Sequence, residues 1–220
     1  MYKSQVPMQI ATMPALKVLF SVIDETFVSR INDYIDENRV RLNDHSDQLV
    51  GQIKQDQHSA QLQFNMNDQL PKDLGLFLMT TAEYYAKQHN ITPKSMDISS
   101  MWSIHSYAGD YNPLHEHGTS GLGVSCILFL KVPPQIRGAE SSKMTSMNNS
   151  SGSCDGWTQF VWGANGYMDT SNFRHSTESF VQPEVGKLVM FPIWLKHQVC
   201  PFFGDGERRT LSTNIDICTN

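Results

Sequence analysis

The sequence has no paired cysteine motif, no basic cluster and no long apolar run. Its four cysteines are irregularly spaced and form no CxxC pair, so neither a disulfide framework nor a cysteine-based metal site is indicated. We therefore expect free thiols in a reducing compartment. The N-terminal segment also lacks an apolar stretch long enough for a signal-sequence core or a membrane span. Together these features predict a cytoplasmic protein without a membrane partner.

The charge of the chain bears on whether it binds nucleic acid. The formal net charge is −5, charged residues make up 18% of the chain, and no run of Lys and Arg occurs. A protein that binds nucleic acid usually carries a basic stripe to neutralise phosphates. The composition is otherwise that of an ordinary globular protein, and it argues against a nucleic-acid partner.

The first part of the chain contains two helical patterns. After a candidate N-cap at Asp24, apolar residues recur at every fourth position from Phe27 to Ile35. A second amphipathic pattern spans about residues 72–87 and precedes Pro93. We expect both helices to support a core and to carry no chemistry.

From about residue 98 the pattern changes to short runs of β-branched and aromatic residues. Gly, Pro, Asn and Asp separate these runs, which are ISSMWSIHSY, GVSCILFLKV, WTQFVW, ESFV, KLVMF and RTLSTNIDI. No helical pattern alternates with them, which disfavours a parallel α/β sheet. The predicted fold is mainly β with flanking helices: a double-stranded β-helix (jelly roll) supported by N-terminal α-helices.

The length is compatible with a single domain. We expect one domain over residues 1–220, with a helical support region over about 1–97 and the jelly-roll core over about 98–220. Residues 138–156 (GAESSKMTSMNNSSGSCDG) are polar and aperiodic. This composition predicts a flexible insertion, and the sequence leaves open whether it acts as a lid.

Three of the eight histidines form an ordered pattern. His115 and His117 are two residues apart, so in an extended segment both imidazoles project to one side and can meet one metal ion, while Glu116 projects oppositely. His197 follows the apolar segment KLVMFPIWLK, and a jelly roll can bring it to the same open end. The returning strand begins with Arg208. For the other histidines ordinary polar roles are the simpler interpretation; these are His45, His58, His89, His105 and His175.

The segments WSIHSYAGDYNPLHEHG, SCILFLKVPP, GKLVMFPIWLKHQVCPF and GERRTLSTNI, between Trp102 and Ile215, together resemble the iron(II)/2-oxoglutarate-dependent oxygenase superfamily. More narrowly, they are similar to 2OG-Fe(II) oxygenases common in marine bacteria and their phages, which would place a phage-encoded protein in the host cytoplasm. The resemblance implies Fe(II), 2-oxoglutarate and O2 as cofactor and cosubstrates, with ascorbate as a candidate stimulant. It also implies hydroxylation of an unidentified substrate, either a protein residue or a small metabolite, with release of succinate and CO2.

The resemblance further implies that the metal ligands, and thus the catalytic centre, are His115, His117 and His197. Most of the superfamily has a carboxylate where this chain has His117. Three neutral histidines leave the site one negative charge short unless the cosubstrate or a nearby carboxylate compensates. Glu116 stays open as an alternative ligand if the backbone turns there.

For the cosubstrate, the resemblance implies Arg208 as the anchor of the distal carboxylate of 2-oxoglutarate, assisted by Thr210 and Tyr107. Strand alternation puts Arg208, Thr210 and Ser212 on one face and Arg209 on the other. The ordinary alternatives are one exposed and one ion-paired arginine, and a sheet aromatic for Tyr107. Four aromatic residues can either line the pocket or belong to the core: Trp102, Phe129, Phe191 and Trp194.

Two other functions remain open at this stage. One is a cupin-like metal-binding jelly roll that does not use 2-oxoglutarate, which three histidines would suit well. The other is a non-catalytic jelly-roll interaction module, for which the histidine pattern would be a coincidence. Arg208 separates the first alternative from the oxygenase, because a cupin does not need an arginine facing the metal. The sequence names neither the substrate nor the oligomeric state.

Overall fold

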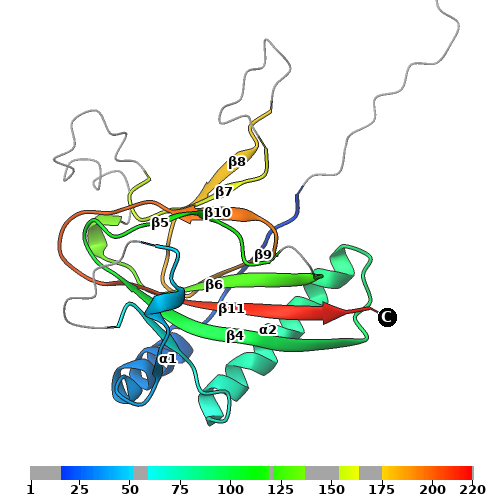
Figure 1. Cartoon of the computed structure of the whole chain (residues 1–220), viewed down its shortest axis with the longest axis horizontal. Coiled ribbons are helices and arrows are strands. Elements are labelled where there is room, and N and C mark those ends of the chain that lie inside the picture. Colours follow the sequence, from blue (N-terminus) through cyan, green and yellow to red (C-terminus); the bar gives the residue numbers. More distant parts are fainter. Residues whose placement is uncertain (1–15, 52–58, 119–120, 137–153, 164–174, 220) are drawn as a thin grey trace, which may run out of the picture.

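The computed structural model describes residues 16–51, 59–118, 121–136, 154–163 and 175–219. Two antiparallel β-sheets lie face to face, and two α-helices cover the outer face of the larger sheet (Figure 1). Within the described ranges no helix has the length and apolarity needed to cross a membrane. None of the four cysteines forms a disulfide, as the sequence predicts.

The larger sheet has seven strands in the order β1-β9-β6-β11-β4-β3-β2. In that order the strands are Leu19–Val22, Lys187–Pro192, Gly123–Lys131, Arg208–Cys218, Ser95–Ser106, Gln61–Gln63 and Asn43–Asp44. The smaller sheet has four strands in the order β5-β10-β7-β8. These are Asn112–His115, Lys196–Val199, Thr158–Val161 and Glu178–Val181.

Both predicted helices are present. Helix α1 (Glu25–Asn38) begins after Asp24, whose carboxylate accepts a hydrogen bond from the backbone N–H of Phe27 at 2.9 Å. Helix α2 (Gln69–Gln88) is longer than its apolar pattern indicates. Short 3-10 helices, η1 and η2, occur at Ser46–Gln48 and Pro134–Ile136.

Strand alternation divides the interior into two apolar layers. In β6, Cys126 and Leu128 pack against the helices, whereas Ile127 and Phe129 face the smaller sheet. A strand buried on both faces reads as a continuous apolar run, which is why GVSCILFLKV shows no polar alternation. The layer between the two sheets ends at the cavity described below.

The jelly roll is confirmed, and each of the six predicted strand runs contains a strand. The N-terminal region needs a correction, because it is not only helical: β1, β2 and β3 join both edges of the larger sheet. These strands have four, two and three residues, too short for periodicity to reveal. The predicted flexible insertion lies outside the described residues as far as residue 153.

Candidate metal and cosubstrate site

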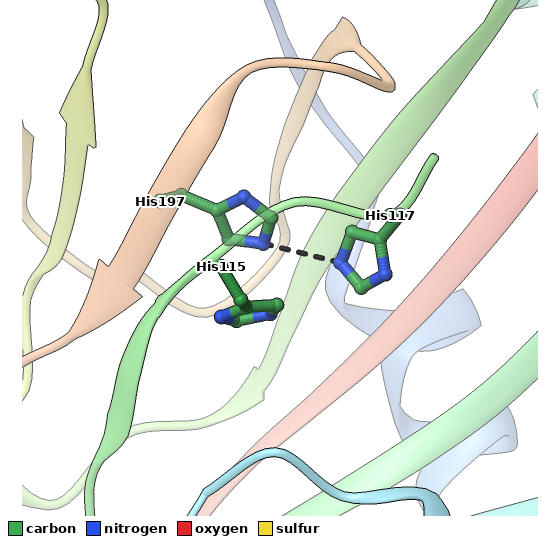
Figure 2. Close-up of side chains that lie close together, drawn as sticks. All are labelled: His115, His117 and His197. Atoms are coloured by element: carbon green, nitrogen blue, oxygen red, sulfur yellow. Dashed lines mark hydrogen bonds between the residues drawn. The ribbon is translucent and has the colours of Figure 1, made fainter. Parts of the chain in front are cut away.

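The three predicted ligand histidines meet at one end of the smaller sheet. His115 ends β5 and pairs directly with His197 on the neighbouring strand β10. His117 follows β5, and its backbone N–H donates to the carbonyl of Ile193 at 3.2 Å. The candidate ligand atoms of the three side chains all lie within 4.8 Å of one another, and Figure 2 shows the three imidazoles converging.

Backbone carbonyls orient two of these imidazoles. Nδ1 of His115 lies 2.7 Å from the carbonyl oxygen of Pro113, and Nδ1 of His197 lies 3.0 Å from that of Leu195. A carbonyl only accepts, so each Nδ1 must carry a proton, and in the neutral imidazole Nε2 then keeps a free lone pair. Ligand histidines in metalloproteins are held by this same second contact.

The spacing of the Nε2 atoms fits a shared cation. Those of His117 and His197 are 3.2 Å apart (Figure 2). Two imidazole nitrogens at a typical metal–nitrogen distance of about 2.0–2.1 Å lie roughly 3 Å from each other when they are adjacent ligands. The donor set therefore fits one divalent metal ion bound by nitrogen.

Burial favours the neutral form of His117 and His197. It lowers the pKa of His117 to about 4 and that of His197 to about 3, and the neighbouring His115 contributes in the same direction. A neutral imidazole is the form that binds a metal. In this form neither His117 nor His197 adds charge to the site, whereas a carboxylate in the place of His117 would add a negative one.

Glu116 borders the same cavity but does not belong to the group of converging ligand atoms. It lies between two histidines of that group, where the chain has left strand β5 after His115 and bends at His117. This placement agrees with the predicted three-histidine set, which we carry forward as a proposal.

The histidines line a cavity of about 360 Å³. One wall consists of strands β3, β4 and β11, and the opposite wall consists of β5 and β10. The segment 45–50 completes the lining, and Gly51 fits closely against β5. A Cβ atom at Gly51 would lie 1.8 Å from Oδ1 of Asn112 and 2.8 Å from the carbonyl oxygen of Tyr111, so only glycine permits this approach.

Arg208 lines the cavity and is 2% exposed. Its Nε donates to the carbonyl of Gly156 at 2.9 Å, Nη2 lies 3.4 Å from Oγ1 of Thr158, and the guanidinium lies 5.3 Å from the ring centre of Phe129. Burial lowers its pKa to about 10, which leaves it charged at neutral pH. In the part of the chain that the structure describes, no carboxylate forms an ion pair with Arg208. A buried cation without a counter-charge is a binding site for an anion.

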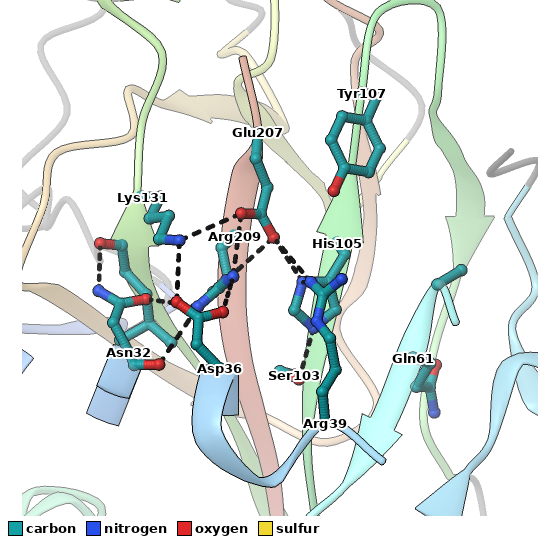
Figure 3. A network of polar contacts seen from close by, with 12 residues as sticks. Asn32, Asp36, Arg39, Gln61, Ser103, His105, Tyr107, Lys131, Glu207 and Arg209 are labelled. Atoms are coloured by element: carbon teal, nitrogen blue, oxygen red, sulfur yellow. Dashed lines mark hydrogen bonds and ion pairs between the residues drawn. The ribbon is translucent and has the colours of Figure 1, made fainter. Parts of the chain in front are cut away.

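Arg209 has the opposite environment. Glu207 binds it through two contacts of 2.9 and 3.0 Å, and Asp36 of helix α1 lies 2.6 Å from Nη2 (Figure 3). Thr210 and Ser212 line the cavity together with Arg208, so the predicted alternation of the strand is confirmed. Neither arginine is exposed, which makes the alternative of one exposed arginine wrong.

Tyr107 is not brought to the cavity. It follows the end of β4 and is not among the residues that line the cavity. Figure 3 draws it with the polar network of Glu207 and His105, the face of the sheet opposite to Arg208. Alternation along β4 puts Tyr107 on the side of His105, and the register of the structure pairs His105 with Arg209. The predicted role of Tyr107 in cosubstrate binding therefore has no support from its position.

The four aromatic residues have different places. Trp102 lines the cavity, and the ring of Phe191 lies 4.9 Å from that of His197. Phe129 contacts Arg208. Trp194 is half-exposed and borders a separate groove beside helix α2.

Several residues at the site could not be assigned to it from the sequence, because long-range contacts bring them there. Gly156 and Thr158 contact Arg208, and the N-terminal region contributes further lining residues, His45, Gln48, Gln61 and Gln63. The alternation of polar and apolar residues in Gln61-Leu62-Gln63-Phe64 agrees with β3, but it is too short to identify a strand by itself.

The fold and the histidine cluster define the class of jelly-roll oxygenases that use Fe(II) and 2-oxoglutarate. Residues 100–214, just over half of the chain, match the profile of the family described as "Putative 2OG-Fe(II) oxygenase". The chain belongs to this family. None of the curated protein sequences matches it.

Solved structures of this fold cover most of the chain. A prolyl-4-hydroxylase from Pseudomonas putida has a TM-score of 0.57 at 15% identity, over 93% of this chain and 94% of that one. The viral collagen prolyl hydroxylase of Paramecium Bursaria Chlorella virus-1, in complex with 2-oxoglutarate, has a TM-score of 0.54 at 12% identity, over 90% and 94%. Iron-bound HygX from Streptomyces hygroscopicus gives 0.54 at 11% identity, over 91% and 82%. At these identities the similarity shows the fold alone.

Proposed function

We propose that this chain is an Fe(II)- and 2-oxoglutarate-dependent hydroxylase whose metal ligands are His115, His117 and His197. The observation that carries the proposal is the combination of converging Nε2 atoms and an unpaired buried arginine in one cavity. The substrate would be a protein residue or a small metabolite, and succinate and CO2 would be released. Iron with bound 2-oxoglutarate and O2 supplies the oxidising chemistry.

Arg208 would bind the distal carboxylate of 2-oxoglutarate. Its planar guanidinium matches a carboxylate in two-point fashion, and its remaining contacts to Gly156 and Thr158 fix its direction. Thr210 lines the cavity from the same face of β11 and offers a hydroxyl group to the same carboxylate. Apolar side chains such as Ile104 and Ile127 line the cavity beside these groups and exclude water.

The absence of a carboxylate from the proposed ligand set has a consequence for binding order. Three neutral imidazoles offer no negative charge to a divalent cation, whereas 2-oxoglutarate carries two carboxylates. We therefore expect metal and 2-oxoglutarate to strengthen each other's binding, and linkage requires that both affinities rise by the same factor. Arg208 contributes to this coupling because it holds the far end of the cosubstrate.

A cupin-like metal site that does not use 2-oxoglutarate is the competing function. A buried arginine without a counter-charge is unfavourable unless an anion binds it, and this supports the oxygenase. Membership of the oxygenase family argues against a non-catalytic interaction module.

The test is 2-oxoglutarate consumption and succinate release by the purified protein with Fe(II), ascorbate and O2. The proposal expects turnover that requires both Fe(II) and 2-oxoglutarate, even without the physiological substrate. A protein that binds metal but shows neither succinate release nor 2-oxoglutarate binding would support the cupin-like alternative.

The net charge and the cysteines bear on the kind of substrate and on the cellular compartment. The net charge of −5 favours a substrate other than nucleic acid. Cysteines that form no disulfide agree with a reducing cytoplasm, where we expect the protein to act. A marine bacterial or phage origin stays a prediction.

A further inference from the structure

The cavity wall opposite the smaller sheet is an ordered array of side chains. Strands β3, β4 and β11 lie side by side, and their register pairs Gln63 with Trp102 and Trp102 with Ser212. The adjacent row consists of Gln61, Ile104 and Thr210. All six residues line the cavity, so the sheet presents them on one surface.

Trp102 places this surface next to the metal site. The centre of its ring lies 5.7 Å from that of His117, and the residue is 8% exposed. An indole is a broad, rigid platform for an apolar or weakly polar group. A substrate unit packed on Trp102 would therefore lie beside the proposed metal ligands.

The two glutamines beside Trp102 have free hydrogen-bonding capacity. Their side-chain amides form no hydrogen bond with any residue that the structure describes, although Gln61 is only 8% exposed. Figure 3 draws Gln61 without a contact to the neighbouring polar network. Leu62, between them, packs against the helices, so both amides project toward the cavity. Buried amides normally have partners, and each glutamine offers two donors and one acceptor.

The surface around Trp102 carries no charge. Arg208 and Glu116 are the only Asp, Glu, Lys or Arg residues among the described residues that line the cavity. Arg208 is assigned to 2-oxoglutarate, and Glu116 lies on the opposite wall, between two histidines. A charged substrate group would lose its hydration against Gln61 and Gln63 without gaining a counter-charge.

We infer that the substrate presents an uncharged unit with an apolar face, flanked by amide or hydroxyl groups, and that Gln61, Gln63 and Trp102 select it. The apolar face packs on Trp102, and the flanking groups bond to the two glutamines. This inference rests on the proposed function, because it assumes that the reacting unit lies beside the metal. Neutral amides and neutral sugar rings share this chemistry.

The test uses two series of small probes that differ in charge. One series is the N-acetyl amides of leucine, lysine and glutamate, and the other is methyl glucoside, methyl glucosaminide and methyl glucuronide. Proton relaxation of each probe is measured with the anaerobic protein loaded with Mn(II) and saturated with 2-oxoglutarate, and with Zn(II) as the diamagnetic control. Binding of Mn(II) and of 2-oxoglutarate is measured first. Failure at that step rejects the proposed function, whereas failure of the probes alone rejects this inference.

In at least one series the neutral probe should show the strongest Mn(II)-dependent relaxation. The series in which it does so tells whether the substrate unit is an amide or a sugar ring. Gln63→Leu should weaken that probe about tenfold, which corresponds to ~1.4 kcal/mol for a lost hydrogen bond. Gln63→Glu should instead shift the preference to the cationic member. Gln88→Glu, on the exposed surface of α2, is the matched control and should change nothing.

Three results would overturn the inference. The first is a charged probe that binds best in both series. The second is the absence of Mn(II)-dependent relaxation for every neutral probe in protein that binds metal and 2-oxoglutarate. The third is an unchanged order of preference in folded Gln63→Glu.

Discussion

Arg208 and Arg209 are neighbours on one strand, and both are almost completely buried, yet their surroundings are opposite. Arg209 is saturated by Glu207, Asp36 and Asn32. Among the described residues, Arg208 contacts only a carbonyl, a hydroxyl and an aromatic ring. A protein gains stability from a buried charge only when that charge is fully paired. The contrast indicates that Arg209 serves the fold and that Arg208 is kept for a ligand.

The largest effect is expected from removing the arginine that serves the fold. Arg209→Ala removes the buried cation nearest to Glu207 and Asp36 and leaves Lys131, at 3.3 and 3.4 Å, as the cation that they share. Breaking such a buried pair lowers the free energy of unfolding by about 3–5 kcal/mol. Chemical denaturation measures the change. Arg30→Ala, on the exposed side of α1, is the control and should shift the free energy of unfolding by less than about 0.5 kcal/mol. Equal effects of the two substitutions on the free energy of unfolding would contradict the claim that Arg209 stabilises the fold.

Arg208→Ala should affect ligand binding instead. We expect the affinity for 2-oxoglutarate to fall by at least about 2 kcal/mol, the range for truncating one partner of a buried hydrogen-bonded charge pair. The free energy of unfolding of the ligand-free protein should fall far less than in Arg209→Ala, because no carboxylate loses its partner. Calorimetric titration of 2-oxoglutarate into the Mn(II)-loaded protein measures the affinity. Unchanged binding in a folded variant would remove Arg208 from the site.

The ion pairs around Arg209 also predict how the free energy of unfolding depends on pH. Burial raises the pKa of Glu207, but hydrogen bonds from His105 and Arg209 outweigh it and hold the pKa well below its ordinary value. A carboxyl with a depressed pKa stabilises the fold above its unfolded pKa of about 4.3, and this contribution is lost as the pH falls toward the folded pKa.

Wild type should therefore exceed Glu207→Gln in free energy of unfolding by about 1–3 kcal/mol at pH 7, and the difference should shrink below roughly pH 4. Denaturant titrations of both proteins over this pH range isolate the contribution, because all other carboxyl groups are shared. A difference that stays constant or grows on acidification would contradict the assignment.

The smallest effect is expected from a change in segment 45–51, which lines the same cavity as Arg208 and fits against β5. In Gly51→Ala the new Cβ collides with Asn112 and the backbone of Tyr111, and relieving such overpacking costs about 1–3 kcal/mol. Part of this should appear as weaker 2-oxoglutarate binding, because the displaced segment opens the cavity. Gly121→Ala, where a Cβ meets nothing within 4 Å, is the control. Similar behaviour of the two variants would show that segment 45–51 does not close the site.

Much of the site was predictable because its signals are local. The alternation from Arg208 to Ser212 needs only a regular strand, and these residues do line the cavity. The two histidines of the HxH pair converge as expected, although β5 ends at His115 and the chain bends at His117, so the segment is not extended throughout. The order of the motifs in the resembled family then indicated His197 as the third ligand beside His115 and His117. The fold class followed from the density of short apolar runs after residue 98.

The remainder depends on contacts that leave no local trace. Strand β3 has three residues, and its place beside β4 comes from long-range pairing, so Gln61 and Gln63 could not be assigned to the cavity. The burial of Arg209 depends on Asp36, which lies on a distant helix. The family resemblance placed Tyr107 in the cavity. Tyr107 instead follows the alternation of His105, which pairs with Arg209 on the other face of the sheet.

The central claim is that three neutral histidines alone supply the protein ligands of one metal ion. Mn(II) binding, followed by electron paramagnetic resonance with 2-oxoglutarate present, tests it directly in four proteins: wild type, His197→Ala, Glu116→Gln and His175→Ala. The account predicts that His197→Ala loses Mn(II) binding almost entirely, whereas Glu116→Gln and His175→Ala, the latter altered at an exposed position, bind one ion as wild type does. Loss of binding in Glu116→Gln, or equal behaviour of His197→Ala and His175→Ala, would contradict the ligand assignment.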